Sequence, residues 1–280
     1  MLRTLAESRD SSLVFALSVP RVIRRSMLGM LLTLAVVAAA YSADPDCMPN
    51  ASLPPAEVGQ PRNLSDFKAE LLNYKCSGAY DREFREVIDQ AITQVVTRAR
   101  ENREKDHAQL AIVLDIDETS LSNWEEMKAN DFNLIEDGPC SVAKSDALGW
   151  PVPAAPCGFV EWMLLAGAKP SDTIRLYTKA RENNVAVFFI TGRKEIKKDD
   201  HRVFDATAEN LRKAGYKDWE KLLVRSFEDK TSIQDFKTAM RIEIEKKYKI
   251  IANVGDQYSD LRGGHAEQVY KVPNPFYFVP

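Results

Sequence analysis

The sequence predicts an α/β fold in which helices cover both faces of a mainly parallel sheet. Short apolar runs rich in β-branched residues recur along the chain, and stretches with helical periodicity separate most of them. Strands that alternate with helices in this way are typical of parallel sheets. The 280 residues are 45% hydrophobic and 28% charged, which is typical of a globular protein that buries a sizeable core.

The first 43 residues predict an export signal. Residues 27–40 form an uncharged apolar run that follows Arg21, Arg24 and Arg25 and leads into small residues. As a helix this run would span about 21 Å, which is less than the roughly 30 Å hydrocarbon core of a bilayer. We therefore expect a signal peptide over residues 1–43, no stable membrane anchor, and a periplasmic or secreted protein. An uncleaved anchor is the alternative.

An irregular arm and a helical segment follow the predicted signal peptide. Residues 44–62 are rich in proline and predict an extended arm. From residue 63 to about residue 106, apolar residues recur at helical spacing. We expect this helical segment to open a single domain that covers residues 63–280.

The rest of this domain predicts a strand and helix alternation with one interruption. Five strands are expected at residues 110–114, 185–190, 222–224, 250–254 and 269–272, and three helices at 172–183, 202–214 and 232–248. The stretch from 120 to 170 breaks this rhythm and is rich in Trp, Pro, Gly and Cys. We expect it to be an insertion rather than another strand and helix unit.

Charge and cysteine content limit the partners and the compartment. The net charge is −3, and residues 1–43 hold five basic and two acidic side chains, so their removal leaves −6. A nucleic-acid binder usually has a basic excess, so we expect no nucleic acid partner. All four cysteines follow residue 43 and can pair in an oxidising compartment. Nearness in sequence favours Cys47–Cys76 and Cys140–Cys157, with free thiols as the alternative.

The sharpest motif is Asp115-Ile116-Asp117-Glu118-Thr119, directly after the predicted strand 110–114. Ligands of open parallel sheets bind beyond the carboxyl ends of the strands. Two carboxylates so close together at that end suit a divalent cation, because hard cations take oxygen ligands. An isolated pair of this kind is more often a solvated acidic turn, so the rest of the chain decides its meaning.

Three further features stand in the order that a phosphotransfer site needs. Thr191-Gly192-Arg193 follows the strand 185–190 and offers a hydroxyl, a backbone amide and a guanidinium to a phosphate. Lys237 lies early in the predicted helix 232–248. Asp256 and Asp260 follow the strand 250–254 and supply two more carboxylates.

Four ordered motifs carry a family resemblance. The chain reads DIDETSLSN, FFITGR, FKTAMR and NVGDQYSDL, and it ends in VPNPFY followed by three residues. This series resembles the haloacid dehalogenase (HAD) superfamily of phosphatases. It is most similar to the secreted branch that holds class C bacterial acid phosphatases and plant acid phosphatases with vegetative storage proteins. The resemblance covers about residues 60–280 and implies a three-layer Rossmann-like core, a small cap, and hydrolysis of small phosphomonoesters.

The resemblance also implies the roles of the charged residues. Asp115 would attack phosphorus to form an aspartyl-phosphate, and Asp117 would act as general acid and then as base. Asp256 and Asp260 would hold Mg²⁺ together with the Asp115 carboxylate and the Asp117 backbone carbonyl. Lys237 would stabilise the charge of the transferring group.

The remaining predicted site residues concern the substrate. Thr191, Gly192 and Arg193 would bind phosphoryl oxygens, and residues 123–170 would form the cap. Trp124 and Tyr258 are candidates to stack on an aromatic leaving group such as a nucleoside base, with core packing as the alternative.

Other activities are less compatible with the sequence or remain open beside this one. No histidine stands in an Arg-His-Gly motif, and the three histidines are not clustered, which disfavours histidine acid phosphatases and dinuclear metallophosphatases. Phosphotransfer to an alcohol shares the aspartyl-phosphate and is an alternative. A weakly active storage or binding protein on the same scaffold is the alternative from another class. The substrate and the oligomeric state are not predicted.

Overall fold

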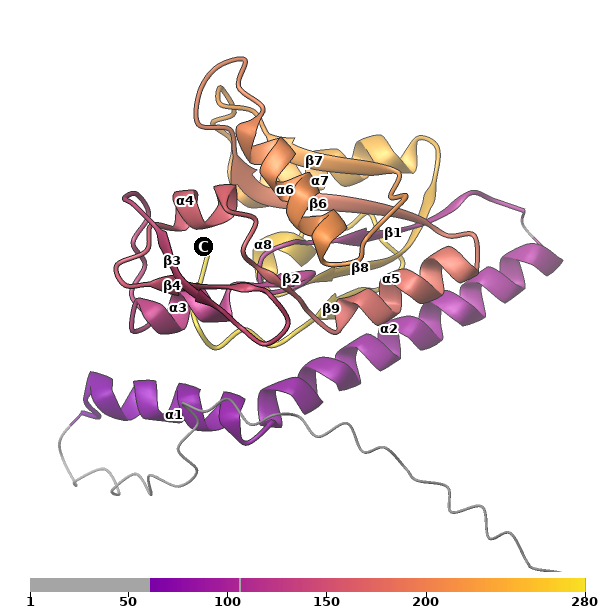
Figure 1. Ribbon diagram of the computed structural model, residues 1–280. Helices are drawn as coiled ribbons and strands as arrows, with labels where there is room; N and C mark the ends of the chain where they lie inside the picture. The colour runs from indigo at the N-terminus through magenta and orange to yellow at the C-terminus, as the bar shows by residue number, and fades with distance from the viewer. Residues whose placement is uncertain (1–60, 106, 280) are drawn as a thin grey trace, which may run out of the picture. The chain divides into compact units, whose positions relative to one another are not determined.

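The computed structural model of this chain describes residues 61–105 and 107–279 (Figure 1). The predicted signal peptide and nearly all of the predicted arm lie outside these residues. Among the described helices, none is both long enough and apolar enough to span a membrane.

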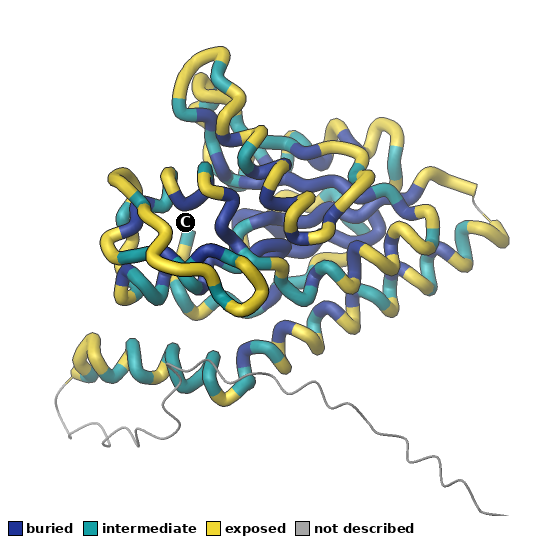
Figure 2. Tube along the Cα trace, viewed as in Figure 1, coloured by how far each residue is buried: buried dark blue, intermediate teal, exposed yellow. Residues whose placement is uncertain are grey.

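A five-stranded, fully parallel sheet forms the centre of the domain, which confirms the predicted α/β fold. The strands lie in the order β7 (Lys221–Arg225), β6 (Ala186–Lys194), β1 (Leu110–Leu114), β8 (Lys249–Gly255) and β9 (Val269–Lys271). The central strand β1 is buried along its whole length, because helices cover both faces of the sheet. Figure 2 shows this buried centre in dark blue.

Alternate residues of β1 feed two separate apolar cores. Ile112 and Leu114 pack in the larger core with α2 (Ala79–Glu104), α5 (Thr173–Glu182) and α6 (Arg202–Lys213). The opposite face of the strand packs against α7 (Ile233–Glu245). Successive side chains of a strand point to opposite faces, so a strand between two layers of helices must be apolar throughout.

Helix α7 covers the second face of the sheet with a short apolar stripe. Its Ile244, Phe236 and Met240 pack on the side of the sheet that Ala111 and Val113 face. The Ser232 side chain accepts a hydrogen bond from the Asp235 amide and so caps the first turn of the helix.

The predicted N-terminal helical segment consists of two helices. Helix α1 (Leu64–Cys76) ends before α2 begins, and Gly78 between them has a φ of 72°, in the left-handed region that favours glycine. Helix α2 buries residues at helical spacing along one side, and it packs beside α5 (Figure 1). The turn lets α2 follow the sheet while α1 departs from it.

Strand β6 runs four residues beyond its predicted end. It includes Thr191, Gly192, Arg193 and Lys194, because a register shift lets Lys194 pair with Arg225 of β7. The residues that we predicted to bind phosphate after the strand therefore form its last part.

The segment predicted as a cap, residues 123–170, folds as small elements rather than as a further strand and helix unit. These elements are α3 (Trp124–Ala129), the antiparallel pair β3 (Ser141–Ser145) and β4 (Pro151–Ala154), α4 (Phe159–Leu164) and β5 (Lys169–Pro170). Strand β5 pairs with β2 (Leu121–Ser122), so the segment leaves and rejoins the core at one place.

Disulfides form as the cysteine spacing predicts, as far as the described residues extend. Cys140 precedes β3, Cys157 follows β4, and the two are joined. Cys76 is also disulfide-bonded. Its predicted partner, Cys47, lies outside the described residues.

Candidate active site

The candidate site lies where three neighbouring parallel strands end. Asp115 follows β1, Thr191 lies in the last part of β6, and Asp256 follows β8. Because β6 and β8 both pair with β1, their carboxyl ends meet at the same edge of the sheet. The fold thus gathers motifs that are far apart in sequence.

Three buried carboxylates form the centre of the site. Asp115, Asp256 and Asp260 are each at most 6% exposed, and each offers an oxygen within 4.8 Å of the others. Asp260 comes from the short helix α8 (Tyr258–Leu261), and the Gln257 amide donates to its Oδ2 over 2.8 Å. A Cβ on Gly255 would lie only 2.4 Å from that of Asp260, so glycine is required there.

Lys237 neutralises part of this charge. Its buried Nζ donates to Asp115 Oδ1, and to Asp260 Oδ1 over 2.6 Å. Burial alone would lower the pKa of Lys237, but Asp115 and Asp260 raise it, so the side chain stays an ammonium. Burial raises the pKa of Asp115 well above its usual range, and Lys237 opposes that rise.

The donor set fits a hard divalent cation. One ammonium stands against three buried carboxylates, so negative charge remains uncompensated. Burial and the Asp260 charge raise the pKa of Asp256, which is the response of a carboxyl group that lacks a sufficient counter-charge. A Mg²⁺ ion takes oxygen ligands and would supply that charge.

Asp117 lies to one side of this cluster and has its own partners. Arg193 donates from Nε to Asp117 Oδ2 over 2.9 Å and from Nη2 to Oδ1 over 2.7 Å. Asn123 Nδ2 donates to Oδ1 over 2.9 Å. Burial would raise the pKa of Asp117, but the Arg193 charge and these hydrogen bonds lower it overall.

The predicted phosphate-binding residues lie at the site in different states. Thr191 is fully buried, and its Oγ1 accepts a hydrogen bond from the Arg193 amide over 3.1 Å. Gly192 lies between them in the same strand. The Arg193 guanidinium donates to Asp117 and to Thr207 Oγ1, and its contact with a phosphate stays a prediction.

The two aromatic candidates differ in environment. Trp124 is 7% exposed, and its ring packs 5.7 Å from Phe132 and 5.4 Å from Phe276 between ring centroids. This is the core packing that we named as the alternative, and stacking of Trp124 on a substrate stays a prediction. Tyr258 is 52% exposed, with the Lys271 ammonium 5.4 Å from its ring centroid.

Several site residues received no role from the sequence. Asn274 Nδ2 donates to Asp256 Oδ2 over 2.7 Å, and Arg241, which is fully buried, donates to the Asp260 carbonyl over 2.7 Å. Asn123 orients Asp117. All three stand inside the motifs that carry the resemblance, so motif membership was the available signal, while their partners depend on tertiary contacts.

A parallel α/β sheet that gathers three carboxylates and a lysine at its carboxyl edge has the arrangement of the HAD class of phosphotransfer proteins. Within that class, the chain belongs to the HAD superfamily, subfamily IIIB (acid phosphatase), whose family model matches residues 60–280. This match covers all of the described motifs.

Individual relatives agree with the family. The chain is 35% identical over 125 residues to the Stem 28 kDa glycoprotein of Glycine max, covering 42% of this chain and 47% of that protein. It is 35% identical over 111 residues to Acid phosphatase 1 of Solanum lycopersicum, covering 39% and 41%. The chain therefore matches less than half the length of these curated relatives.

A solved structure shares the fold. The class C acid phosphatase from Bacillus anthracis matches with a TM-score of 0.55 and 19% sequence identity, over 76% of this chain and 86% of that one. At this identity the likeness shows the fold alone.

Proposed function

We propose that this protein is an exported, Mg²⁺-dependent acid phosphatase that hydrolyses small phosphomonoesters through an aspartyl-phosphate on Asp115. The observation that carries the proposal is the contact of buried Asp115 with Lys237, beside Asp256 and Asp260. An oxygen nucleophile needs a cationic environment when it approaches a dianionic phosphate, and this cluster supplies part of it.

The first half-reaction transfers the phosphoryl group to the enzyme. An Asp115 oxygen forms a bond to phosphorus while the bond from phosphorus to the ester oxygen breaks. Asp117 gives its proton to the leaving oxygen, so an alcohol departs. Lys237 faces the developing charge, and Thr191 with the nearby amides would hold phosphoryl oxygens.

The second half-reaction releases phosphate. Asp117 is now a carboxylate, and it takes a proton from the water that attacks phosphorus, while the Asp115 carboxylate leaves. The pairing of Asp117 with Arg193 favours this charged state. A bound phosphomonoester brings negative charge next to Asp117, which favours the protonated form needed in the first half-reaction. A bound Mg²⁺ would supply counter-charge to the carboxylates of Asp115, Asp256 and Asp260 and to the phosphate.

One feature supports export, and another supports catalysis over storage. Formation of the Cys140–Cys157 disulfide suits an oxidising compartment. A relative of 30% identity is named Vegetative storage protein 1 of Arabidopsis thaliana, so storage is a serious alternative. Asp115 and its lysine partner are both present here, and storage alone requires neither. Nucleoside 5′-monophosphates are a candidate substrate class.

Release of p-nitrophenol from p-nitrophenyl phosphate tests the proposal. We expect turnover with Mg²⁺ at acidic pH, loss of turnover in EDTA, and recovery when Mg²⁺ is returned in excess. Absence of turnover in a folded, Mg²⁺-loaded protein would favour the storage alternative. Product that appears as a phosphorylated alcohol when alcohols are added would show phosphotransfer.

A further inference from the structure

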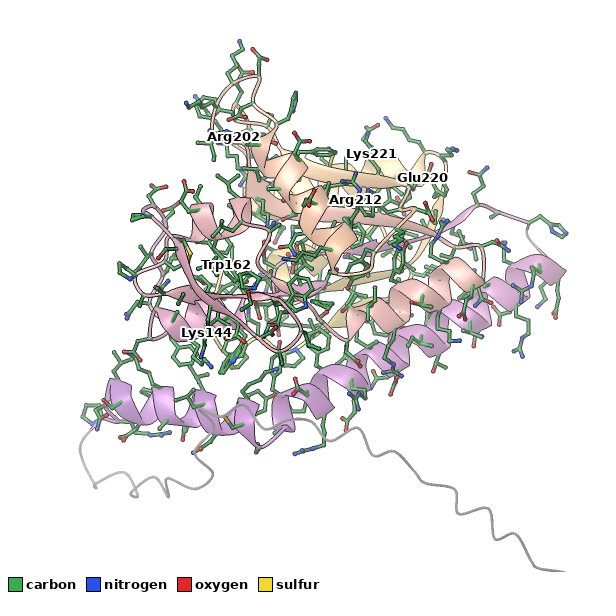
Figure 3. All side chains as sticks on the ribbon, in the orientation of Figure 1. Lys144, Trp162, Arg202, Arg212, Glu220 and Lys221 are labelled. Atoms are coloured by element: carbon green, nitrogen blue, oxygen red, sulfur yellow. A yellow bond between two sulfur atoms is a disulfide. The ribbon has the colours of Figure 1, made fainter. Side chains whose placement is uncertain are left out.

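A chain of two hydrogen bonds connects Trp162 of α4 to Asp117 through Asn123. The Trp162 indole Nε1 on α4 donates to Asn123 Oδ1 over 3.0 Å, and Asn123 Nδ2 donates to Asp117 Oδ1 over 2.9 Å. Trp162 is 1% exposed and Asn123 is 2% exposed. Figure 3 shows Trp162 directed from α4 into the interior of the domain.

The chemistry of tryptophan decides which group donates and which accepts in these two hydrogen bonds. An indole N–H can only donate, so it requires the carbonyl oxygen of the Asn123 amide. The NH₂ group of that amide must then face Asp117. Without the indole, the amide could turn over and present its oxygen to a carboxylate.

Packing holds both residues in place. The Asn123 backbone amide donates to Glu118 Oε1 over 2.6 Å, which fixes its backbone beside the motif. A Cβ on Gly167 would lie 2.5 Å from two ring atoms of Trp162, so the chain passes directly against the indole. The Asn123 backbone is thus fixed, and the Trp162 indole is closely packed against residue 167.

The two oxygens of Asp117 therefore differ. Oδ1 accepts from both Asn123 and Arg193, whereas Oδ2 accepts from Arg193 Nε alone. Oδ2 therefore keeps acceptor capacity that Oδ1 lacks, because two donors already occupy the lone pairs of Oδ1.

We propose that Trp162 is a positioning residue that acts through Asn123 to fix the orientation of the Asp117 carboxyl group. This inference rests on the proposed function for its effect on turnover, although the hydrogen bonds themselves can be tested without turnover. In this arrangement residues 123–170 hold the proposed general acid, Asp117, in a fixed orientation, besides any contact they make with substrate.

Substrates with different leaving groups separate this role from a structural one. An alkyl phosphomonoester needs a proton on its leaving oxygen, whereas p-nitrophenolate departs as a stable anion. We expect Trp162→Phe to lower kcat/KM for the alkyl ester about tenfold, mainly through kcat, which is a part of the roughly 10²–10⁴-fold that general acid catalysis contributes. The loss with p-nitrophenyl phosphate should stay below about twofold, because no acid is needed there.

A second variant and a matched control complete the test. Asn123→Ala should likewise lose more activity with the alkyl ester than with p-nitrophenyl phosphate. The double variant should be no less active than Asn123→Ala, because both substitutions break the same series of hydrogen bonds. Trp219→Phe removes another indole at the opposite end of the sheet, before β7, and should leave both substrates unaffected. Equal losses on the two substrates, or additive losses in the double variant, would overturn the proposal.

A measurement without substrate separates failure of this inference from failure of the proposed function. The Trp162 indole N–H should exchange slowly with deuterium in the wild type and much faster in Asn123→Ala. Fast exchange in the wild type would refute the hydrogen-bond chain even if the enzyme is active. Slow exchange in a protein without phosphatase activity would refute the proposed function and leave the chain of hydrogen bonds standing.

Discussion

Buried carboxyl groups dominate the chemistry of individual residues in this domain. Burial raises the pKa of Glu118 to about 8 and that of Glu126 to about 7. Asp117 lies close to both in sequence, yet its pKa is lowered, because Arg193 pairs with it. Neighbouring carboxyl groups thus differ in charge at the same pH according to their partners.

Glu126 offers a pH test at the residue scale. Its folded pKa of about 7 exceeds the ordinary value of 4.5, so between these values the folded protein holds a proton that the unfolded chain releases. Stability from this group is therefore lost as the pH rises from 4.5 through 7. We expect Glu126→Gln to raise the free energy of unfolding by roughly 1–3 kcal/mol at pH 8 and by little at pH 4, since each pKa unit corresponds to about 1.4 kcal/mol.

Thermal unfolding at several pH values measures this difference. The Asn130 hydrogen bond to Oε1 can persist in Glu126→Gln. The exposed Glu161 on α4 offers a matched control variant, Glu161→Gln. A Glu126→Gln effect that is the same at pH 4 and pH 8 would show that the pKa of Glu126 is not raised in the folded protein.

The location of a site residue was predictable from the sequence where a motif directly follows a predicted strand. Asp115 and Asp256 follow apolar strands, so their place at the sheet edge follows from the topology. The partner of Arg193 was not predictable, because a guanidinium binds a carboxylate as readily as a phosphate and the choice depends on its distance from Asp117. The roles assigned to the site residues stay predictions.

At the scale of elements, a disulfide and side-chain hydrogen bonds hold residues 123–170 together, rather than a large apolar core. Strand β3 is exposed along its whole length, and the Cys140–Cys157 disulfide closes the hairpin. Asn130 at the end of α3 donates to the Cys157 carbonyl over 2.7 Å and accepts from the Cys157 amide over 3.0 Å. The cysteine spacing predicted the disulfide. Strands β3 and β4 were not predicted, because their sequences lack the apolar alternation of a half-buried strand.

Removal of the disulfide tests how far it supports this segment. The two cysteines are 17 residues apart, and closing a loop of that size stabilises a protein by about 3 kcal/mol. We expect Cys140→Ser/Cys157→Ser to lower Tm by roughly 2–4 °C for each kcal/mol lost. An unchanged Tm would mean that Asn130 and α3 hold the hairpin by themselves.

Titration of thiols in the denatured, unreduced protein is the companion measurement. We expect almost no free thiol in the wild type, since the described cysteines are all bonded. Two or more thiols per chain would contradict the paired state.

For the whole molecule, the sheet gathers negative charge that its own residues do not balance. Strand order places the ends of β1, β6 and β8 together, and each contributes to the site. The alternation of strands and helices predicted this architecture, because each strand had to be apolar on both faces. It did not predict the break between α1 and α2, since apolar residues recur at helical spacing on both sides of Ser77 and Gly78.

Metal binding should therefore stabilise the folded domain. A ligand present at 100 times its Kd stabilises the folded state by about 2.7 kcal/mol, so Mg²⁺ should raise Tm by several degrees. Asp256→Asn should abolish most of that shift, whereas Asp205→Asn, on the exposed side of α6, should keep it. A Tm that Mg²⁺ leaves unchanged in the wild type would argue against a cation at the three carboxylates.

The central claim is that Asp115 carries the phosphoryl group during turnover. The enzyme is quenched with acid during turnover and treated with borohydride, which reduces an aspartyl-phosphate to homoserine. Mass spectrometry of the peptides then locates the homoserine. We predict homoserine at position 115, and neither homoserine nor turnover in Asp115→Asn. Homoserine at another position, or turnover that survives in Asp115→Asn, would contradict the account.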